Sequence, residues 1–373
     1  MPSLYFLLYS TYTFATFPVR LIAILVSNIP RFNRANPAWS YKTAVVTEIF
    51  RFFIRYRTRV RYQTPKSLEP GAEGDRFIVL NPQKTISKSD QENTEISVYT
   101  GILSSIPEIQ PIPIGAIWYP KKPAEKPIKR LIIHLHSSAF VMLGARPSDG
   151  PGWGPSSLGE ISGWPVLSIQ YRLSWDKYKT FPAALQDLMT AYVYALETLK
   201  IPASQIVLSG ESAGSNLILA LLRHIDTENP SIPLPRAALL WSPWVDMTEK
   251  SLRELKNRPN YKTDYLPDEF VQWGAAGYIP EGWDEKNPYF TPLGNEYKLS
   301  LPLFIEAGTS EVLYDDIMQF AHNMKEKGND VELREAPNGP HVSFSWGEDF
   351  GMEEVARAGH ALATEFIERA GEE

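Results

Sequence analysis

Short apolar runs alternate with helical stretches along the chain from about residue 112 onward. Each run is four to six residues long, and most are rich in Val, Ile and Leu, which is typical of a buried strand. The predicted strands cover 114–119, 130–135, 166–171, 206–209, 237–241, 303–307 and 331–335. Helical stretches cover 183–199, 215–225 and 314–327, between several of these strands. This alternation predicts an α/β fold with a mostly parallel central sheet and helices on both faces.

Two segments depart from the alternation. Residues 1–70 are helical in pattern, apolar at first and basic later, and we expect an N-terminal helical lid or a membrane-associating segment there. Residues 71–373 form the predicted main domain, in which 245–300, rich in Trp, Tyr, Pro and charge, contributes further lid elements. Residues 87–97 are polar and predict a mobile loop.

The net charge of −6 is unevenly distributed. Residues 1–66 contain ten Lys or Arg and a single acid, Glu48, so this segment carries +9 and the remainder −15. The arginines alternate with apolar residues and no nucleic-acid motif accompanies them, so contact of residues 1–61 with a membrane surface is favoured over nucleic-acid binding.

The apolar run of residues 3–27 leaves three interpretations open. It is a lid helix over an apolar site, an interfacial membrane helix, or a spanning helix, although Pro18 and Arg20 interrupt it near its middle. No basic start and no clear cleavage site precede the domain, so secretion is not indicated. We expect an intracellular protein, cytoplasmic or membrane-associated.

The most specific motif is Gly210-x-Ser212-x-Gly214, which lies between an apolar β-branched run and a good helix-forming run. A serine at the tip of a sharp strand-to-helix turn needs small residues two positions before and after it, because strand and helix pass close to each other there. The context therefore predicts a nucleophilic serine at Ser212.

A serine hydroxyl needs a histidine base, and that histidine needs a carboxylate to fix its tautomer. Of the six histidines, His341 lies in a loop directly after the last predicted strand, where a base is expected. Glu311 is the first carboxylate after the strand at 303–307 and is the predicted acid. Asp315 is the alternative, but it falls at the start of a helix, where an acid also serves as a helix-terminal charge.

Backbone N–H groups after an early strand complete such a site. We expect those of Ser138 and Ala139, together with that of Ala213 next to the nucleophile, to bind the oxyanion. The predicted substrate contacts are His136, Ser137, Phe140 and Trp244. The chain has no cysteine, hence no thiolate metal site, and we expect neither a metal nor another cofactor.

With these residues in view, the chain resembles the hormone-sensitive-lipase-like branch of the α/β-hydrolases, particularly its fungal members. The resemblance covers residues 110–365. It rests on blocks with the sequences His136-Ser137-Ser138-Ala139-Phe140, Tyr171-Arg172-Leu173, Phe181-Pro182-Ala183-Ala184 with Asp187, Gly210-Glu211-Ser212-Ala213-Gly214, Ser242-Pro243-Trp244-Val245-Asp246, Asn287-Pro288-Tyr289, Glu311-Val312-Leu313-Tyr314-Asp315 and His341-Val342-Ser343-Phe344. It implies a metal-free serine carboxylesterase with an N-terminal helical lid, acting on a small-molecule ester.

The sequence departs from the family pattern at Ser137-Ser138, where the family has two glycines. We expect the backbone donors to survive if the local φ values are negative, because serine is restricted at positive φ. The departure favours one alternative, in which the fold catalyses acyl transfer, condensation or cyclisation of a biosynthetic intermediate. A non-catalytic ligand receptor is disfavoured, because Ser212, Glu311 and His341 are all present.

Overall fold

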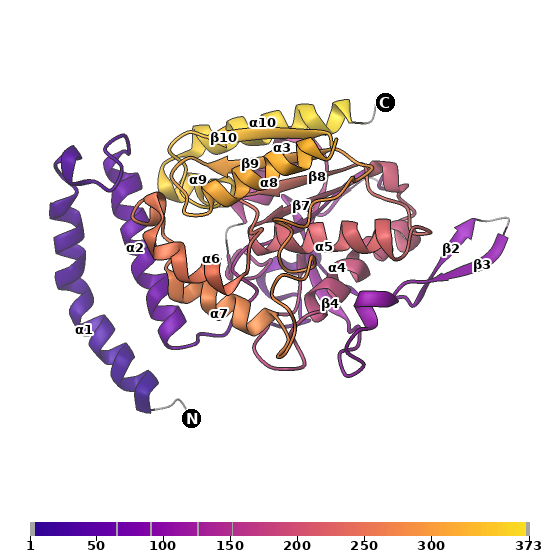
Figure 1. Ribbon diagram of the computed structural model, residues 1–373, viewed down its shortest axis with the longest axis horizontal. Helices are drawn as coiled ribbons and strands as arrows, with labels where there is room; N and C mark the ends of the chain where they lie inside the picture. Colours follow the sequence, from indigo (N-terminus) through magenta and orange to yellow (C-terminus); the bar gives the residue numbers. More distant parts are fainter. Residues whose placement is uncertain (1–3, 65, 90–91, 125–126, 151, 371–373) are drawn as a thin grey trace.

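The structure is a computed structural model that describes residues 4–370 except 65, 90–91, 125–126 and 151. Its central sheet has eight strands in the order β1-β4-β6-β5-β7-β8-β9-β10 (Figure 1). All neighbours from β6 to β10 pair in parallel, whereas β4 runs antiparallel to both β1 and β6. The strands are β1 (Phe77–Leu80), β4 (Ile114–Tyr119), β5 (Leu131–Leu135), β6 (Val166–Gln170), β7 (Ile206–Glu211), β8 (Ala237–Trp241), β9 (Leu303–Gly308) and β10 (Val331–Ala336). The predicted mostly parallel sheet is confirmed.

Helices cover both faces of this sheet, because successive side chains of each central strand are buried on opposite sides. Ile132 of β5 belongs to the core under one set of helices, and Ile133 belongs to the core under the other. The first set is α3 (Trp153–Ser162), α9 (Ser343–Phe350) and α10 (Glu353–Arg369). The second set is α4 (Ala183–Val193), α5 (Ala213–Thr227) and α8 (Tyr314–Glu326).

Two further helices, α6 (Glu249–Glu254) and α7 (Asp268–Tyr278), come from the segment for which lid elements are predicted. They lie next to α2 (Tyr41–Arg59) at the side of the sheet where the strands have their carboxyl ends (Figure 1). The chain therefore places three helices over the edge at which β7, β9 and β10 end. Ligand sites of open α/β sheets lie at this edge.

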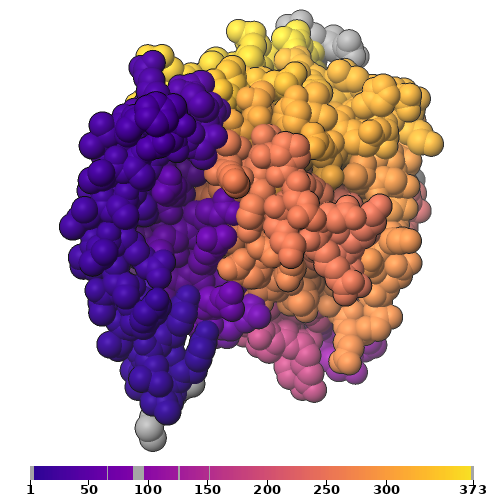
Figure 2. Space-filling view, turned by 60° about the vertical axis from the view of Figure 1, so that its left-hand side comes forward, coloured from indigo at the N-terminus to yellow at the C-terminus, as the bar shows by residue number. Residues whose placement is uncertain are grey.

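The N-terminal helix α1 (Leu4–Ser27) is separated from that edge by α2. It packs on α2 through aromatic contacts, such as Phe17 against Phe52 with ring centroids 5.2 Å apart. Thr13 is its only buried residue among those described. Figure 2 shows the N-terminal segment as an outer layer on one side of the molecule. The interpretation of the first apolar run as a helix over the site is wrong, because α2 occupies that place.

The outer face of α1 is apolar and open to solvent. Leu8, Val19 and Ile22 are exposed by 62%, 72% and 62%. By length and composition α1 is sufficient to cross a membrane, a test that a signal sequence near the N-terminus also passes. Only 6% of its most apolar window is buried, so α1 is not a core helix of the folded domain.

Residues 67–111 contain regular structure that the sequence pattern does not predict. The segment expected to be a mobile loop contains β2 (Thr85–Ser89) and β3 (Glu92–Ser97), which pair antiparallel. Residues 90–91, inside the predicted loop, lie outside the described part of the chain. β1 is also unpredicted, and it closes one edge of the main sheet by pairing with β4.

Candidate active site

Ser212 lies at the turn between β7 and α5, with φ 52° and ψ −111°. A non-glycine residue with positive φ is strained, and such strain is characteristic of functional turns. Two backbone hydrogen bonds hold the turn: the Ser212 N–H donates to Trp241 O at 2.9 Å, and the Trp244 N–H donates to Ser212 O at 3.2 Å. The turn presents the Ser212 side chain to a cavity at the carboxyl edge of the sheet.

Only glycine fits at positions 210 and 214, because a side chain there would overlap neighbouring atoms. A Cβ at Gly214 would lie 2.5 Å from Leu135 O and 2.9 Å from His136 O. A Cβ at Gly210 would lie 2.6 Å from the carbonyl carbon of Gly214. These neighbours are backbone atoms and cannot rotate away, so the glycine spacing inferred from the sequence has a steric cause here.

We expect Gly214→Ala to destabilise the protein by about 1–3 kcal/mol, because the new methyl overlaps backbone atoms of the neighbouring strand. Urea unfolding measures the change. Gly282→Ala is a contrasting variant: nothing lies within 4 Å of its added Cβ, but its φ is +82°, so it measures backbone strain without overlap, whereas Gly214 lies in α5 and has no positive φ. An unchanged urea midpoint for Gly214→Ala would mean that the close approach is not as described.

Glu311 and His341 form a buried pair next to Ser212. Glu311 follows β9, His341 follows β10, and Glu311 Oε2 is 2.6 Å from His341 Nδ1. The other carboxylate oxygen accepts hydrogen bonds from the Gly308 N–H at 2.6 Å and from Ser242 Oγ at 3.1 Å. Because Nδ1 faces the carboxylate, we assign the proton to Nδ1, which leaves Nε2 with a lone pair to accept a proton.

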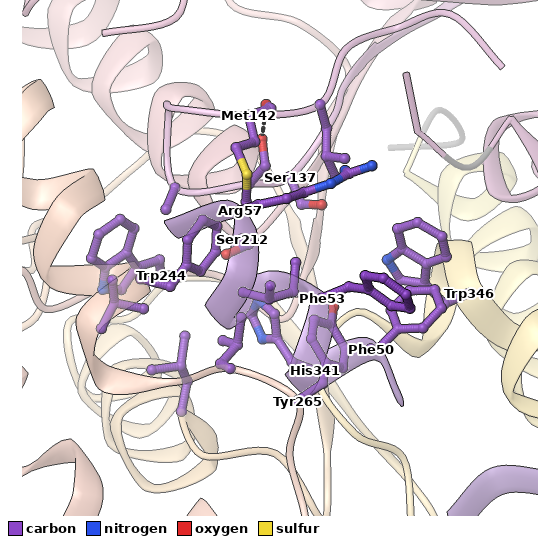
Figure 3. A pocket seen from close by; sticks show the side chains of 18 of the residues that line it. Phe50, Phe53, Arg57, Ser137, Met142, Ser212, Trp244, Tyr265, His341 and Trp346 are labelled. Atoms are coloured by element: carbon purple, nitrogen blue, oxygen red, sulfur yellow. Dashed lines mark hydrogen bonds between the residues drawn. The ribbon is translucent and has the colours of Figure 1, made fainter. Parts of the chain in front are cut away.

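Ser212 and His341 line the same cavity, and Figure 3 shows both side chains directed into it. Among the described residues no hydrogen bond joins the Ser212 hydroxyl to the imidazole. Such contacts are often long in sites without substrate and shorten when substrate binds. Asp315, the alternative acid, lies exposed in the first turn of α8 and does not line the cavity.

Sequence reasoning missed two residues that hold Glu311 in place. The Ser242 hydroxyl accepts the Val342 N–H at 3.0 Å and donates to Glu311, so it connects the loops of the acid and the base. Asp264 accepts the Val312 N–H at 2.7 Å, directly after Glu311. Burial raises the pKa of Asp264 to about 6, while His341 and the Val312 N–H act in the opposite direction.

The loop after β5 adopts positive φ values, whereas the backbone donors were expected to survive if these values were negative. Ser138, Ala139 and Phe140 have φ values of 101°, 50° and 63°. That condition is not met, because contacts with other segments hold the loop in this conformation. The Ser174 N–H donates to Phe140 O at 2.7 Å, and a Cβ at Gly274 of α7 would lie only 2.5 Å from Ala139 O. Serine therefore occupies the conformation that glycine favours.

The residues predicted to bind the oxyanion or the substrate separate into two groups. Ser137, Ser138, Ala139 and Trp244 line the cavity, and Ala213 begins α5 beside Ser212. His136 and Phe140 do not line it, because their rings are used in packing. His136 stacks on Tyr171 with centroids 4.1 Å apart, and Phe140 stacks on Tyr278 at 3.6 Å. Burial lowers the pKa of His136 well below its usual value, so it is neutral.

The cavity has a volume of about 330 Å³ and a mostly apolar lining. Its walls come from α2, the loop after β5, the segment 244–271 and the loops after β9 and β10. The contribution of α2 (Ile49, Phe50, Phe53, Ile54 and Arg57) was missed. The sequence did contain a signal for this wall, because these positions recur with the spacing of one face of a helix.

Comparison with known proteins agrees with this geometry. A family model described as alpha/beta hydrolase fold matches residues 132–345, more than half of the chain. The chain belongs to the α/β-hydrolase family. Its membership explains the nucleophile turn and the order serine, acid, histidine along the chain.

Several members of the family are similar to this chain. An acetyl-hydrolase of Streptomyces hygroscopicus is 30% identical over 57% of this chain and 68% of its own length. An esterase of Acinetobacter venetianus is 27% identical over 61% of this chain and 70% of its own. Most of these relatives are bacterial, and one is from Schizosaccharomyces pombe, so the expected fungal-type membership stays a prediction.

Solved structures with similar folds include proteins of the hormone-sensitive-lipase type. A hormone-sensitive lipase from a metagenome library is 25% identical, with a TM-score of 0.57 over 69% of this chain and 82% of its own. An esterase from the bacterial hormone-sensitive lipase family has a TM-score of 0.62 over 89% of this chain and 99% of its own, at 23% identity. The predicted α/β-hydrolase fold is confirmed.

Proposed function

We propose that this α/β-hydrolase cleaves a carboxylic ester of a small to medium apolar molecule through Ser212, His341 and Glu311. The observation that carries the proposal is the buried Glu311–His341 pair at 2.6 Å, which opens onto the same apolar cavity as the strained Ser212. Relatives named acetyl-hydrolase, esterase and carboxylesterase confirm the class of enzyme, a carboxylic ester hydrolase. By analogy with fungal members, the natural reaction is a deacetylation or lactone opening in natural-product metabolism.

Each step of the reaction has a group in the cavity. His341 Nε2 takes the proton of Ser212 Oγ, which attacks the ester carbonyl, and the charge on the carbonyl oxygen is held by the N–H groups of Ser138, Ala139 and Ala213. His341 then gives the proton to the departing alcohol, leaving an acyl-enzyme on Ser212. A water molecule, deprotonated by His341, releases the acid and restores Ser212.

The cavity volume predicts the acyl preference. At about 330 Å³ it lies near the lower end of the ~300–1,000 Å³ that is usual for ligand sites. We expect kcat/KM for p-nitrophenyl esters to be highest for acyl chains of intermediate length and to decline toward decanoate. Spectrophotometric rates from acetate to decanoate test the proposal, and no hydrolysis of any of these esters by folded protein would count against it.

The oxyanion loop gives little support to the non-hydrolytic alternative. That alternative was favoured because two serines replace two glycines, and a changed loop could reshape the oxyanion site. Ser138 and Ala139 nevertheless hold the positive φ values that glycine adopts readily, and both line the cavity with Ser212. Hydrolysis is therefore the reaction that the loop supports.

The N-terminal segment gives a second part of the proposal, contact with a membrane surface through α1. Its outward side chains are large and apolar, and they include Leu8, Val19 and Ile22. α1 packs along α2 and so lies flat on the domain, which suits a helix in the plane of the membrane interface. The lid is then α2, and α1 is the membrane-associating part of residues 1–70.

We expect Val19→Glu and Ile22→Glu to reduce binding to phosphatidylcholine–phosphatidylserine vesicles by at least about tenfold each, since burying such side chains is worth about 1.5–3 kcal/mol. Co-flotation with the vesicles measures binding. Tyr178→Glu is the matched control, because Tyr178 is 56% exposed and lies elsewhere on the surface. A wild-type protein that stays entirely in the aqueous fraction contradicts the membrane contact.

A further inference from the structure

Arg57 is a permanent charge in an otherwise uncharged cavity. Among the described lining residues, Arg57 and His341 are the only basic side chains, and none is acidic. Arg57 lies on the same face of α2 as Phe50, Phe53 and Ile54, which line the cavity with apolar surface. Arg57 is half-buried there, and a partly desolvated guanidinium is stabilised by hydrogen bonds to an acceptor.

The neighbouring arginines of α2 have oxygen partners, whereas Arg57 has none among the described residues. Arg51 donates to Asp264 O at 2.8 Å. Arg55 and Arg59 lie 3.7 Å and 3.9 Å from a carboxylate oxygen of Glu269. The recorded partner of the Arg57 guanidinium is the ring of Tyr62, with the guanidinium carbon 5.1 Å from the centroid. Its five N–H donors remain available to a ligand.

Arg57 and His341 lie at different ends of the cavity. Phe50 marks the His341 end of α2, since it packs 6.0 Å from the ring of Tyr265, which in turn lies 6.2 Å from His341. Arg57 is seven residues further along, about 10 Å on the helix axis. In the view of Figure 3, Arg57 lies on the side of Ser137 and Met142, with His341 and Tyr265 on the opposite side.

These observations point to the chemistry of the ligand. A carboxylate is planar and matches the guanidinium fork with two parallel hydrogen bonds, which are strengthened where water is excluded. The surrounding residues 1–66 carry +9, so the local field also attracts anions. The rest of the cavity lining is mostly apolar, which suits an unsubstituted hydrocarbon spacer between the ester and the carboxylate.

We propose that the cavity selects amphipathic esters that carry a carboxylate at the end remote from the ester bond, with Arg57 as its binding residue. This inference rests on the proposed ester hydrolysis at Ser212. It makes Arg57 a specificity residue for one substrate class, anionic esters with a spacer of several carbons.

Paired substrates test the inference. In the first series the carboxylate is on the acyl part: mono-4-nitrophenyl esters of dicarboxylic acids with four to eight carbons are compared with the 4-nitrophenyl esters of the matching monocarboxylic acids. In the second series the carboxylate is on the alcohol part: acetylated hydroxy acids are compared with the matching alkyl acetates. We expect the wild type to prefer the carboxylate member of the best pair by about 10- to 100-fold in kcat/KM. A preference of this size is what hydrogen bonds to a charged group typically contribute. Arg57→Met, which keeps the aliphatic stem, should reduce that ratio to near or below one.

Two control variants distinguish a failure of the Arg57 inference from a failure of the proposed ester hydrolysis. Arg59→Met removes a charge from the same helix at a side chain that is 57% exposed and outside the cavity, and it should leave the ratio unchanged. Arg57→Lys should recover part of the ratio if a point charge suffices. Equal or better hydrolysis of the neutral member in every pair, or a preference that survives Arg57→Met, overturns the inference while ester hydrolysis stands. Failure to hydrolyse any member overturns the proposed function itself.

Discussion

Ser212→Ala is expected to lower kcat for ester hydrolysis by a factor on the order of 10⁶, the scale reported for loss of a nucleophilic serine that acts as a unit with its base. The physical reason is that no other hydroxyl takes the place of Ser212 at the tip of the turn between β7 and α5. Rates with a p-nitrophenyl ester, corrected for spontaneous hydrolysis, measure the effect. The residual rate reports what the N–H groups of the site and substrate binding supply alone.

Ser148→Ala is the control for this experiment, since Ser148 is exposed and does not line the cavity. It should retain the wild-type rate. Both variants should also unfold like the wild type, because the Ser212 hydroxyl has no hydrogen-bond partner among the described residues. An alanine variant at Ser212 that keeps more than a small fraction of kcat would assign the nucleophile to another group.

Glu311→Gln is expected to lower kcat by about 10⁴-fold while the protein stays folded. The amide keeps the shape of the carboxylate, but it can donate to His341 Nδ1 and so favour the tautomer with the proton on Nε2. That tautomer cannot accept the proton of Ser212. Gln also removes the negative charge that stabilises the imidazolium cation. Steady-state rates at a fixed pH near neutrality measure the loss.

Asp315→Asn tests the competing assignment of the acid on the same protein. Asp315 lies exposed in the first turn of α8, so we expect a change of less than about twofold in kcat from the loss of a helix-terminal charge. Glu311→Asp should fall between wild type and Glu311→Gln, because the shorter side chain cannot keep the 2.6 Å contact with His341. A larger loss for Asp315→Asn than for Glu311→Gln would reassign the acid.

The parallel strands and the nucleophile turn could be predicted from the sequence because their signals are local. The runs at 114–119 and 237–241 coincide with β4 and β8, since strands that are buried on both faces are continuously apolar. The glycines around Ser212 likewise follow from contacts within one strand–turn–helix unit. In contrast, β1 has only four residues and its assignment depends on pairing with the distant β4, while β2 and β3 are mostly polar and are stabilised as strands by pairing with each other.

The parts of the site that the sequence did not predict depend on contacts between distant elements. Apolar periodicity indicates helices at both α1 and α2, but it does not say which one meets the cavity. The positive φ values from Ser138 to Phe140 are held by partners 34 or more positions along the chain, Ser174 and Gly274. The same holds for Ser242, whose role appears only when the loops of Glu311 and His341 converge on it.

Covalent labelling tests the central claim most directly. The full-length protein is treated with a fluorophosphonate, and the modified residue is located by peptide mass spectrometry while ester hydrolysis is followed in parallel. We predict one phosphonyl group per chain, attached to Ser212, with labelling and loss of activity proceeding at the same rate. Labelling of a different residue, or full activity after Ser212 is labelled, would contradict a mechanism through an acyl-enzyme at Ser212.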